Sequence, residues 1–91
     1  MSDLLEIKVG RTYRAKRPRA AGDILTPLVN DRTVTWCSET KVQYDSPSVS
    51  FGRHYPTISI EKFRSWASHD VTDELPQGEY APWPIKKAGA A

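Results

Sequence analysis

The pattern that most constrains the fold is an alternation of apolar and polar residues, which recurs with a period of two along much of the chain. In residues 12–16, Tyr13 and Ala15 fall on one face and basic residues alternate with them. This period indicates β-strands with one buried face, because successive side chains of a strand point to opposite sides. The same pattern recurs in residues 33–37, 40–44 and 48–51, and we place a last strand near residues 54–58.

The alternation also predicts which side chains reach the core. We expect Val34 and Trp36 to face inward from one strand. From the next strand, we expect Val42 and Tyr44 to face inward. The apolar segment 23–29 contains a proline, which cannot donate to a strand ladder, so we place this segment at an edge or a bend.

The period changes from two to that of a helix after Ser59. Ile60, Phe63 and Ala67 stand at i, i+3 and i+7, a spacing that puts all three on one face of a helix. Ser59 is a good N-cap because its side chain can accept a hydrogen bond from the first turn. The sequence therefore predicts one short helix at about residues 60–67.

Together these elements predict a mostly β domain of five to six short strands with one short C-terminal helix. A small antiparallel barrel, SH3-like or OB-like, is the natural architecture because closure removes the exposed edges of a short sheet. We place this domain at residues 9–71, preceded by a loose arm or short edge strand at 1–8. Residues 72–91 are proline-rich and without strand or helix period, which predicts an extended or disordered tail. So small a core is marginally stable, and either self-association of two copies of the chain or packing of the tail back on the core would stabilise it.

A Gly-x-x-Tyr turn at residues 10–13 leads into the first strand, and a short segment with Phe63 and Trp66 closes the predicted domain. In these features the chain resembles the short SH3-like barrel proteins encoded by bacteriophages and prophages. The resemblance covers about residues 9–67. It implies a small barrel with an accessory role and no known chemistry.

The candidate residues for enzyme chemistry do not form a recognisable pattern. Cys37 with His54 or His69 and a carboxylate such as Asp45 would supply a nucleophile, a base and an orienting group. However, no local signature surrounds Cys37, and a free cysteine in a strand is usually a small buried hydrophobe. We therefore expect no catalytic site and no enzyme activity.

Metal and cofactor sites are also not expected. His69 and Asp70 are the only close pair of metal-ligating residue types, and neighbours at a helix end point apart. No glycine-rich loop that could bind a phosphate cofactor is present, because the five glycines are scattered. The remaining carboxylates weighed for acid–base chemistry mostly fall in predicted turns, and these are Asp31, Glu39, Asp45 and Glu61.

Membrane insertion and secretion are not expected. No run approaches the ~18 consecutive apolar residues that a membrane span needs. The first ten residues lack the basic start and apolar stretch of a signal peptide. We therefore predict a cytoplasmic protein that does not associate with a membrane.

Charge is distributed unevenly along the chain. Residues 8–19 contain six basic residues and no acid, whereas residues 70–79 contain four acids and no base. The basic stretch predicts phosphate contacts with DNA or RNA. Alternatively, it is a solvated face, or acidic residues of the same or a neighbouring chain neutralise it, as the net charge of only +2 allows. The predicted nucleic-acid contacts are Arg11, Arg14, Lys16, Arg17 and Arg19, with Tyr55 as a stacking surface.

The tail supports a second functional hypothesis. Residues 80–84 read Tyr-Ala-Pro-Trp-Pro, which could form a polyproline segment that docks in an aromatic groove. The groove would belong to a partner or to the chain itself. The alternative function is thus a protein-interaction module, such as a phage-type modulator of a host protein, with Tyr80 and Trp83 as contact residues.

Overall fold

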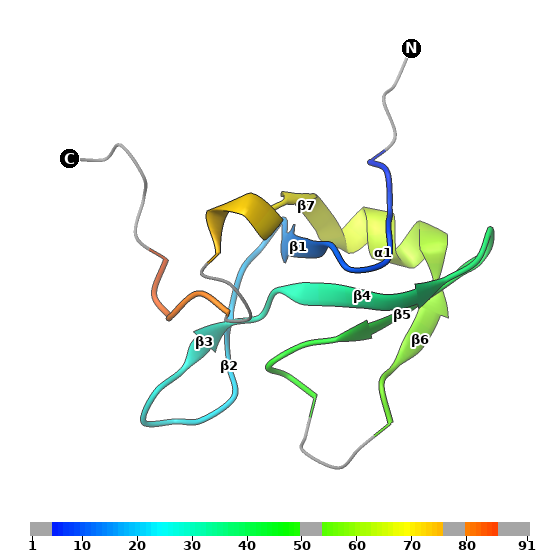
Figure 1. Ribbon diagram of the computed structural model, residues 1–91. Coiled ribbons are helices and arrows are strands. Elements are labelled where there is room, and N and C mark those ends of the chain that lie inside the picture. The colour runs from blue at the N-terminus through cyan, green and yellow to red at the C-terminus, as the bar shows by residue number, and fades with distance from the viewer. Residues whose placement is uncertain (1–4, 50–53, 76–79, 86–91) are drawn as a thin grey trace.

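A computed structural model describes residues 5–49, 54–75 and 80–85 of the chain (Figure 1). It is mostly antiparallel β-structure with one α-helix, which confirms the coarse fold prediction. The elements in chain order are β1 (Thr12–Ala15), β2 (Ala20–Ala21), β3 (Leu28–Val29), β4 (Arg32–Cys37), β5 (Lys41–Asp45), β6 (Thr57–Ser59), α1 (Ile60–Trp66), β7 (Ala67–Asp70) and the 3-10 helix η1 (Thr72–Glu74).

The main sheet has five strands in the order β6-β5-β4-β1-β7, and all neighbours are antiparallel. Strands β4, β5 and β6 follow one another, whereas β7 returns across α1 to pair with β1. Strands β2 and β3 form a separate two-stranded hairpin that projects from the sheet in Figure 1. Within the described residues no ladder joins β6 to β7, the two outer strands of the sheet.

An aromatic cluster joins α1 to the sheet. The ring of Phe63 is fully buried and meets the Tyr13 ring edge-on, with 5.5 Å between the ring centroids. Tyr44 and Trp66 pack on the same ring at 6.0 and 5.3 Å. The predicted inward-facing residues Tyr13, Ala15, Val34, Val42, Tyr44, Phe63 and Ala67 are all buried.

The start of α1 agrees with the predicted cap. The Ser59 hydroxyl accepts a hydrogen bond from Lys62 N at 3.1 Å, and Glu61 lies in the first turn, where a negative charge is favourable. The helix has seven residues and is therefore stabilised mainly by packing. Within the described ranges, no helix has the length and hydropathy to span a membrane.

The prediction that Trp36 faces inward is wrong, because β4 contains a β-bulge. Val34 pairs with Tyr44, but Trp36 pairs with Gln43, so one extra residue lies between two successive pairs. An extra residue reverses the inward and outward alternation of the rest of the strand. Trp36 is 49% exposed as a result, and Cys37 packs against the core instead.

Several other segments differ in extent from the sequence expectation. Strand β6 spans Thr57–Ser59 and so shares only its first two residues with the predicted segment 54–58, and β3 covers only the end of segment 23–29. Ser48 and Val49 lie in a turn and a bend, and the rest of the strand predicted at 48–51 falls outside the described residues.

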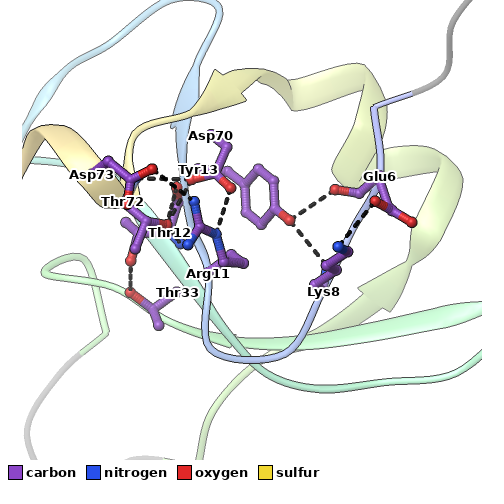
Figure 2. Close-up of polar contacts among 9 residues, drawn as sticks. All are labelled: Glu6, Lys8, Arg11, Thr12, Tyr13, Thr33, Asp70, Thr72 and Asp73. Carbon is purple, nitrogen blue, oxygen red and sulfur yellow. Dashed lines mark hydrogen bonds and ion pairs between the residues drawn. The ribbon is translucent and has the colours of Figure 1, made fainter.

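Residues 5–8, expected to form a loose arm or a short edge strand, contain no helix or strand but are held against β1. The Tyr13 hydroxyl donates to Glu6 O at 2.8 Å and accepts from Lys8 N at 2.9 Å (Figure 2). Ile7 between them is buried in the core cluster.

The bulge leads to a stability prediction. Replacing Val34 with Ala should lower the free energy of unfolding by about 2 kcal/mol, because it removes two buried methyl groups and leaves a cavity. Replacing Trp36 with Ala should change it by less than about 1 kcal/mol, despite the larger truncation, because this side chain is half exposed. Urea denaturation of both variants measures the difference. A larger loss for Trp36→Ala than for Val34→Ala would contradict the bulge.

Candidate functional site

The basic stretch at residues 8–19 divides into two groups in the structure. Three of its bases pair with carboxylates of the same chain, and the other three have no ion pair with any described residue. The paired bases are Lys8 with Glu6, Arg11 with Asp70 and Asp73, and Arg14 with Asp31. The unpaired ones are Lys16, Arg17 and Arg19.

Arg11 is neutralised by two carboxylates, one at the end of β7 and one in η1 (Figure 2). Its Nε donates to Asp70 Oδ2 at 2.7 Å, and its Nη2 lies 3.4 Å from Asp73 Oδ2. The other oxygen of Asp70 accepts from Thr72 Oγ1 at 2.6 Å and from Thr72 N at 2.8 Å. Thr72 Oγ1 in turn accepts from Thr12 N at 2.7 Å. Arg11 therefore belongs to a network that ties β1 to β7 and η1.

This network sets the ionisation of Asp70. Partial burial raises the pKa of Asp70, but the hydrogen bonds from Arg11 and Thr72 outweigh that effect and hold the pKa below its ordinary value. The charged carboxylate is thus favoured in the folded protein. This arrangement stabilises the fold and balances the charge of Arg11 with two carboxylates of the same chain.

Arg14 forms a bidentate pair with a buried carboxylate. Its Nε and Nη2 donate to Asp31 Oδ1 and Oδ2, each at 3.0 Å, and Asp31 is 0% exposed. Such planar two-bond pairs are strong and specific in geometry. Arg14, predicted to contact phosphate, therefore compensates the buried charge of Asp31. Asp31, weighed as an acid–base residue, serves as its partner.

The three unpaired bases line one open hollow together with Arg32. The hollow has a volume of about 530 Å³, and its remaining lining comes from Ala15, Asn30, Ser65 and Trp66. Four cationic residues therefore line a single space, and among the residues that the structure describes no Asp or Glu lines it.

Backbone hydrogen bonds bring these side chains together. Lys16 N donates to Trp66 O at 2.8 Å, which holds the residue after β1 against the end of α1. Arg19 N donates to Asn30 Oδ1, and Asn30 N donates to Arg19 O, both at 3.0 Å. This reciprocal pair closes the base of the β2–β3 hairpin. The hollow therefore lies between the end of α1 and the base of the hairpin.

Arg32 lies at the boundary between the aromatic cluster and the hollow. Its guanidinium carbon is 4.3 Å from the centroid of the Tyr44 ring and 4.1 Å from that of the Trp66 ring. Burial lowers the pKa of Arg32, and no described carboxylate forms an ion pair with it. Cation–π contacts stabilise the guanidinium and fix its position.

Arg32 lies on β4, outside the basic stretch at residues 8–19, so the charge pattern along the sequence did not identify it as a candidate. One signal could have found it. Arg32 stands two residues before Val34, so the alternation places this arginine on the inward face of its strand. An arginine at an inward position requires a partner or an opening to solvent, and this one borders a hollow.

The other candidates from the sequence lie elsewhere. Tyr55 is 45% exposed but is not among the residues that line the hollow. The Cys37 thiol contacts Ile7 O at 3.8 Å, and His69 Nε2 lies 3.7 Å from Glu74 Oε2. Across residues 5–49, 54–75 and 80–85, no three His, Cys, Asp or Glu side chains gather in a way that could hold a metal ion.

Tail residues 80–85 pack on their own chain, whereas tail residues 76–79 and 86–91 lie outside the described residues. Val29 N donates to Ala81 O at 2.8 Å, and Trp83 N donates to Pro27 O at 3.0 Å. Segment 80–85 thereby lies beside β3 in Figure 1. The Tyr80 hydroxyl donates to Thr33 Oγ1 at 2.9 Å, and burial raises the pKa of this phenol. Tyr80 therefore packs against a surface of its own chain.

Comparisons with protein-family models, with curated proteins and with solved structures found no match to this chain. The geometry and charge of the hollow are therefore the basis for assigning a function to this chain.

The Arg11–Asp70 network predicts how stability depends on pH. Because the pKa of Asp70 is lower in the folded than in the unfolded chain, its contribution is complete above about pH 4 and is lost as the pH falls through the folded value. Thermal unfolding of the protein and of Asp70→Asn between pH 7 and pH 2 should show a smaller loss of Tm for the variant. Asp73→Asn, whose side chain is 90% exposed, is the control and should behave like the unaltered protein. An equal loss in Asp70→Asn and the unaltered protein would contradict this role.

Replacing a base that forms a buried ion pair should destabilise the protein more than replacing an unpaired base. Arg14→Ala leaves the buried Asp31 without a partner and should lower the free energy of unfolding by about 3–5 kcal/mol. Arg17→Ala, at an exposed position, should change it by less than about 0.5 kcal/mol. Urea denaturation tests both values, and similar losses in the two variants would refute the distinction.

Proposed function

We propose that this is a non-catalytic accessory protein that binds the phosphate groups of DNA or RNA through the basic hollow. The observation that carries the proposal is the convergence of Lys16, Arg17, Arg19 and Arg32 on one space, whose described lining residues include no Asp or Glu. Neutralising phosphates with such side chains releases counterions from the nucleic acid, which drives binding.

The proposed interface is smaller than the one suggested by the sequence. Arg11 and Arg14 are excluded because carboxylates of the same chain occupy their guanidinium groups. Tyr55 is excluded because it does not line the hollow. Arg32 is added, and the interface thus combines the segment after β1 with the start of β4.

We extend the proposal to the architecture and origin of the protein. The meander β4-β5-β6 and the return of β7 to β1 support an SH3-like barrel, in agreement with the resemblance carried by the turn at 10–13 and by Phe63 and Trp66. The phage or prophage origin rests on this resemblance. We place the proposed binding of DNA or RNA in the cytoplasm.

A separate observation favours the alternative, a protein-interaction module. Ile24 and Leu25, in the loop that joins β2 and β3, are 93% and 88% exposed. Two adjacent exposed aliphatic side chains suit a contact with a host protein or with a second copy of the chain. Tyr80 and Trp83 would take no part in this contact if the tail stays on β3. Replacing Ile24 and Leu25 with Ser should then abolish a salt-tolerant protein contact in a pull-down.

Binding of labelled single- and double-stranded DNA and RNA, measured by fluorescence anisotropy at several salt concentrations, tests the proposed function. We expect affinity to fall linearly with salt on logarithmic axes. The double variant Arg17→Ala/Arg19→Ala should reduce the steepness of that slope by roughly 1.5, because two phosphate contacts are lost.

The matched control is Lys41→Ala/Lys62→Ala. It removes the same charge from two exposed positions that do not line the hollow. The control should keep the slope of the unaltered protein. Equal effects of the two double variants, or the absence of binding at low salt, would refute the proposed interface.

A further inference from the structure

The hollow concentrates more positive charge than one backbone phosphate requires. A phosphodiester carries a single negative charge, and proteins that follow a strand distribute their cations along its length. Here Lys16, Arg17, Arg19 and Arg32 surround one space of about 530 Å³. That volume lies within the usual range of small-ligand sites. The arrangement therefore suits a compact group with more than one negative charge.

Arg32 is preorganised for such a group. The Tyr44 and Trp66 rings lie against its guanidinium carbon at 4.3 and 4.1 Å, so the N–H groups at its edge are the part left for a ligand. Those groups make no hydrogen bond to another described residue. A partly buried guanidinium without an anionic partner is unfavourable, and an oxyanion in the hollow would compensate it.

The surroundings of the hollow leave this charge uncancelled. Asp31 follows Asn30 in the chain, but its carboxylate is already paired with Arg14. The end of α1 carries a partial negative charge that would oppose an anion. However, the Trp66 carbonyl already accepts from Lys16 N, and the helix has only seven residues.

Base stacking is not what this hollow offers. The Trp66 ring packs against Phe63 in a tilted geometry, with 5.3 Å between the ring centroids, and the Arg32 guanidinium lies over the Trp66 ring. The guanidinium therefore takes up ring surface on which a base would otherwise stack. The hollow is therefore suited to recognise a ligand by its negative charge and its acceptor oxygens.

We propose that the hollow binds the terminal phosphate of a nucleic-acid strand, a phosphomonoester, in preference to the phosphodiesters within the strand. A phosphomonoester carries a charge of about −1.5 to −2 near neutral pH and presents three strong acceptor oxygens. It can accept two parallel bonds from Arg32 while Lys16, Arg17 and Arg19 neutralise the remaining charge. This inference rests on the proposed function and narrows it to strand ends.

The test compares short oligonucleotides of one sequence that differ only at their ends. One carries a 5′-phosphate, one a 3′-phosphate, and one hydroxyl groups at both ends. A fourth has hydroxyl ends and two additional nucleotides, whose two phosphodiesters supply at least the charge of the terminal phosphate. At the same salt concentration, we expect at least one phosphorylated strand to bind roughly tenfold or more tightly than both hydroxyl strands. Equal affinities would overturn the inference but leave backbone binding, and hence the proposed function, intact.

Two variants link the preference to the hollow. Arg32→Lys keeps the charge but lacks the planar donor edge, so it should lose most of the preference for a phosphorylated end. Because Arg32 packs between two rings, circular dichroism and thermal unfolding verify its fold. Lys16→Gln, at an exposed position, is the second variant and should weaken the same preference. A preference unchanged in both folded variants would overturn the assignment.

Competition distinguishes a strand end from a free phosphate ligand. Inorganic phosphate and a nucleoside monophosphate should displace the phosphorylated strand only at concentrations well above its dissociation constant. Displacement by either at a concentration equal to that constant would show a small-molecule site and overturn the strand-end assignment. Lack of binding to every oligonucleotide at low salt would refute the proposed function as well.

Discussion

The packing of Phe63 is the contact on which the rest of the structure depends. Its ring joins α1 to Tyr13 on β1 and to Tyr44 on β5, strands that are separated in the sheet by β4. A helix of seven residues is not stable alone, so this burial holds α1 in place. The end of α1 supplies Trp66 to the hollow, and the core therefore positions one wall of the proposed site.

Arg32 connects that core to the proposed function. The aromatic rings that bury Phe63 also support the guanidinium of Arg32, which faces the hollow. A side chain on an open surface would sample many rotamers and lose that freedom on binding. Here the packing of the core has already fixed the orientation of the cation. The same contacts thus stabilise the fold and preorganise a binding group.

Local patterns were sufficient where neighbouring residues decide the outcome. The alternation predicted the burial of Tyr13 and Val42, and the helical spacing with the Ser59 cap predicted α1. Both follow from the geometry of a single element. Trp36 shows the limit, because a bulge depends on the pairing of β4 with β5 and reverses the alternation without a local signal. Three of the four cations of the hollow, Lys16, Arg17 and Arg19, were predicted from the basic stretch. Arg32 was not, because it lies outside that stretch and joins the other three only in the folded chain.

By itself the sequence determined a mostly β chain with one capped helix and an excess of bases near its start. The tertiary structure alone decided which of those bases are free. Asp70 reaches Arg11 across the β1–β7 pairing, and Asp31 reaches Arg14 from the segment before β4. A carboxylate neutralises a cation only at a few ångströms, and separation along the chain gives no measure of that distance. The folded arrangement therefore pairs Arg11 and Arg14 with carboxylates and leaves Lys16, Arg17 and Arg19 at the hollow proposed to bind phosphate.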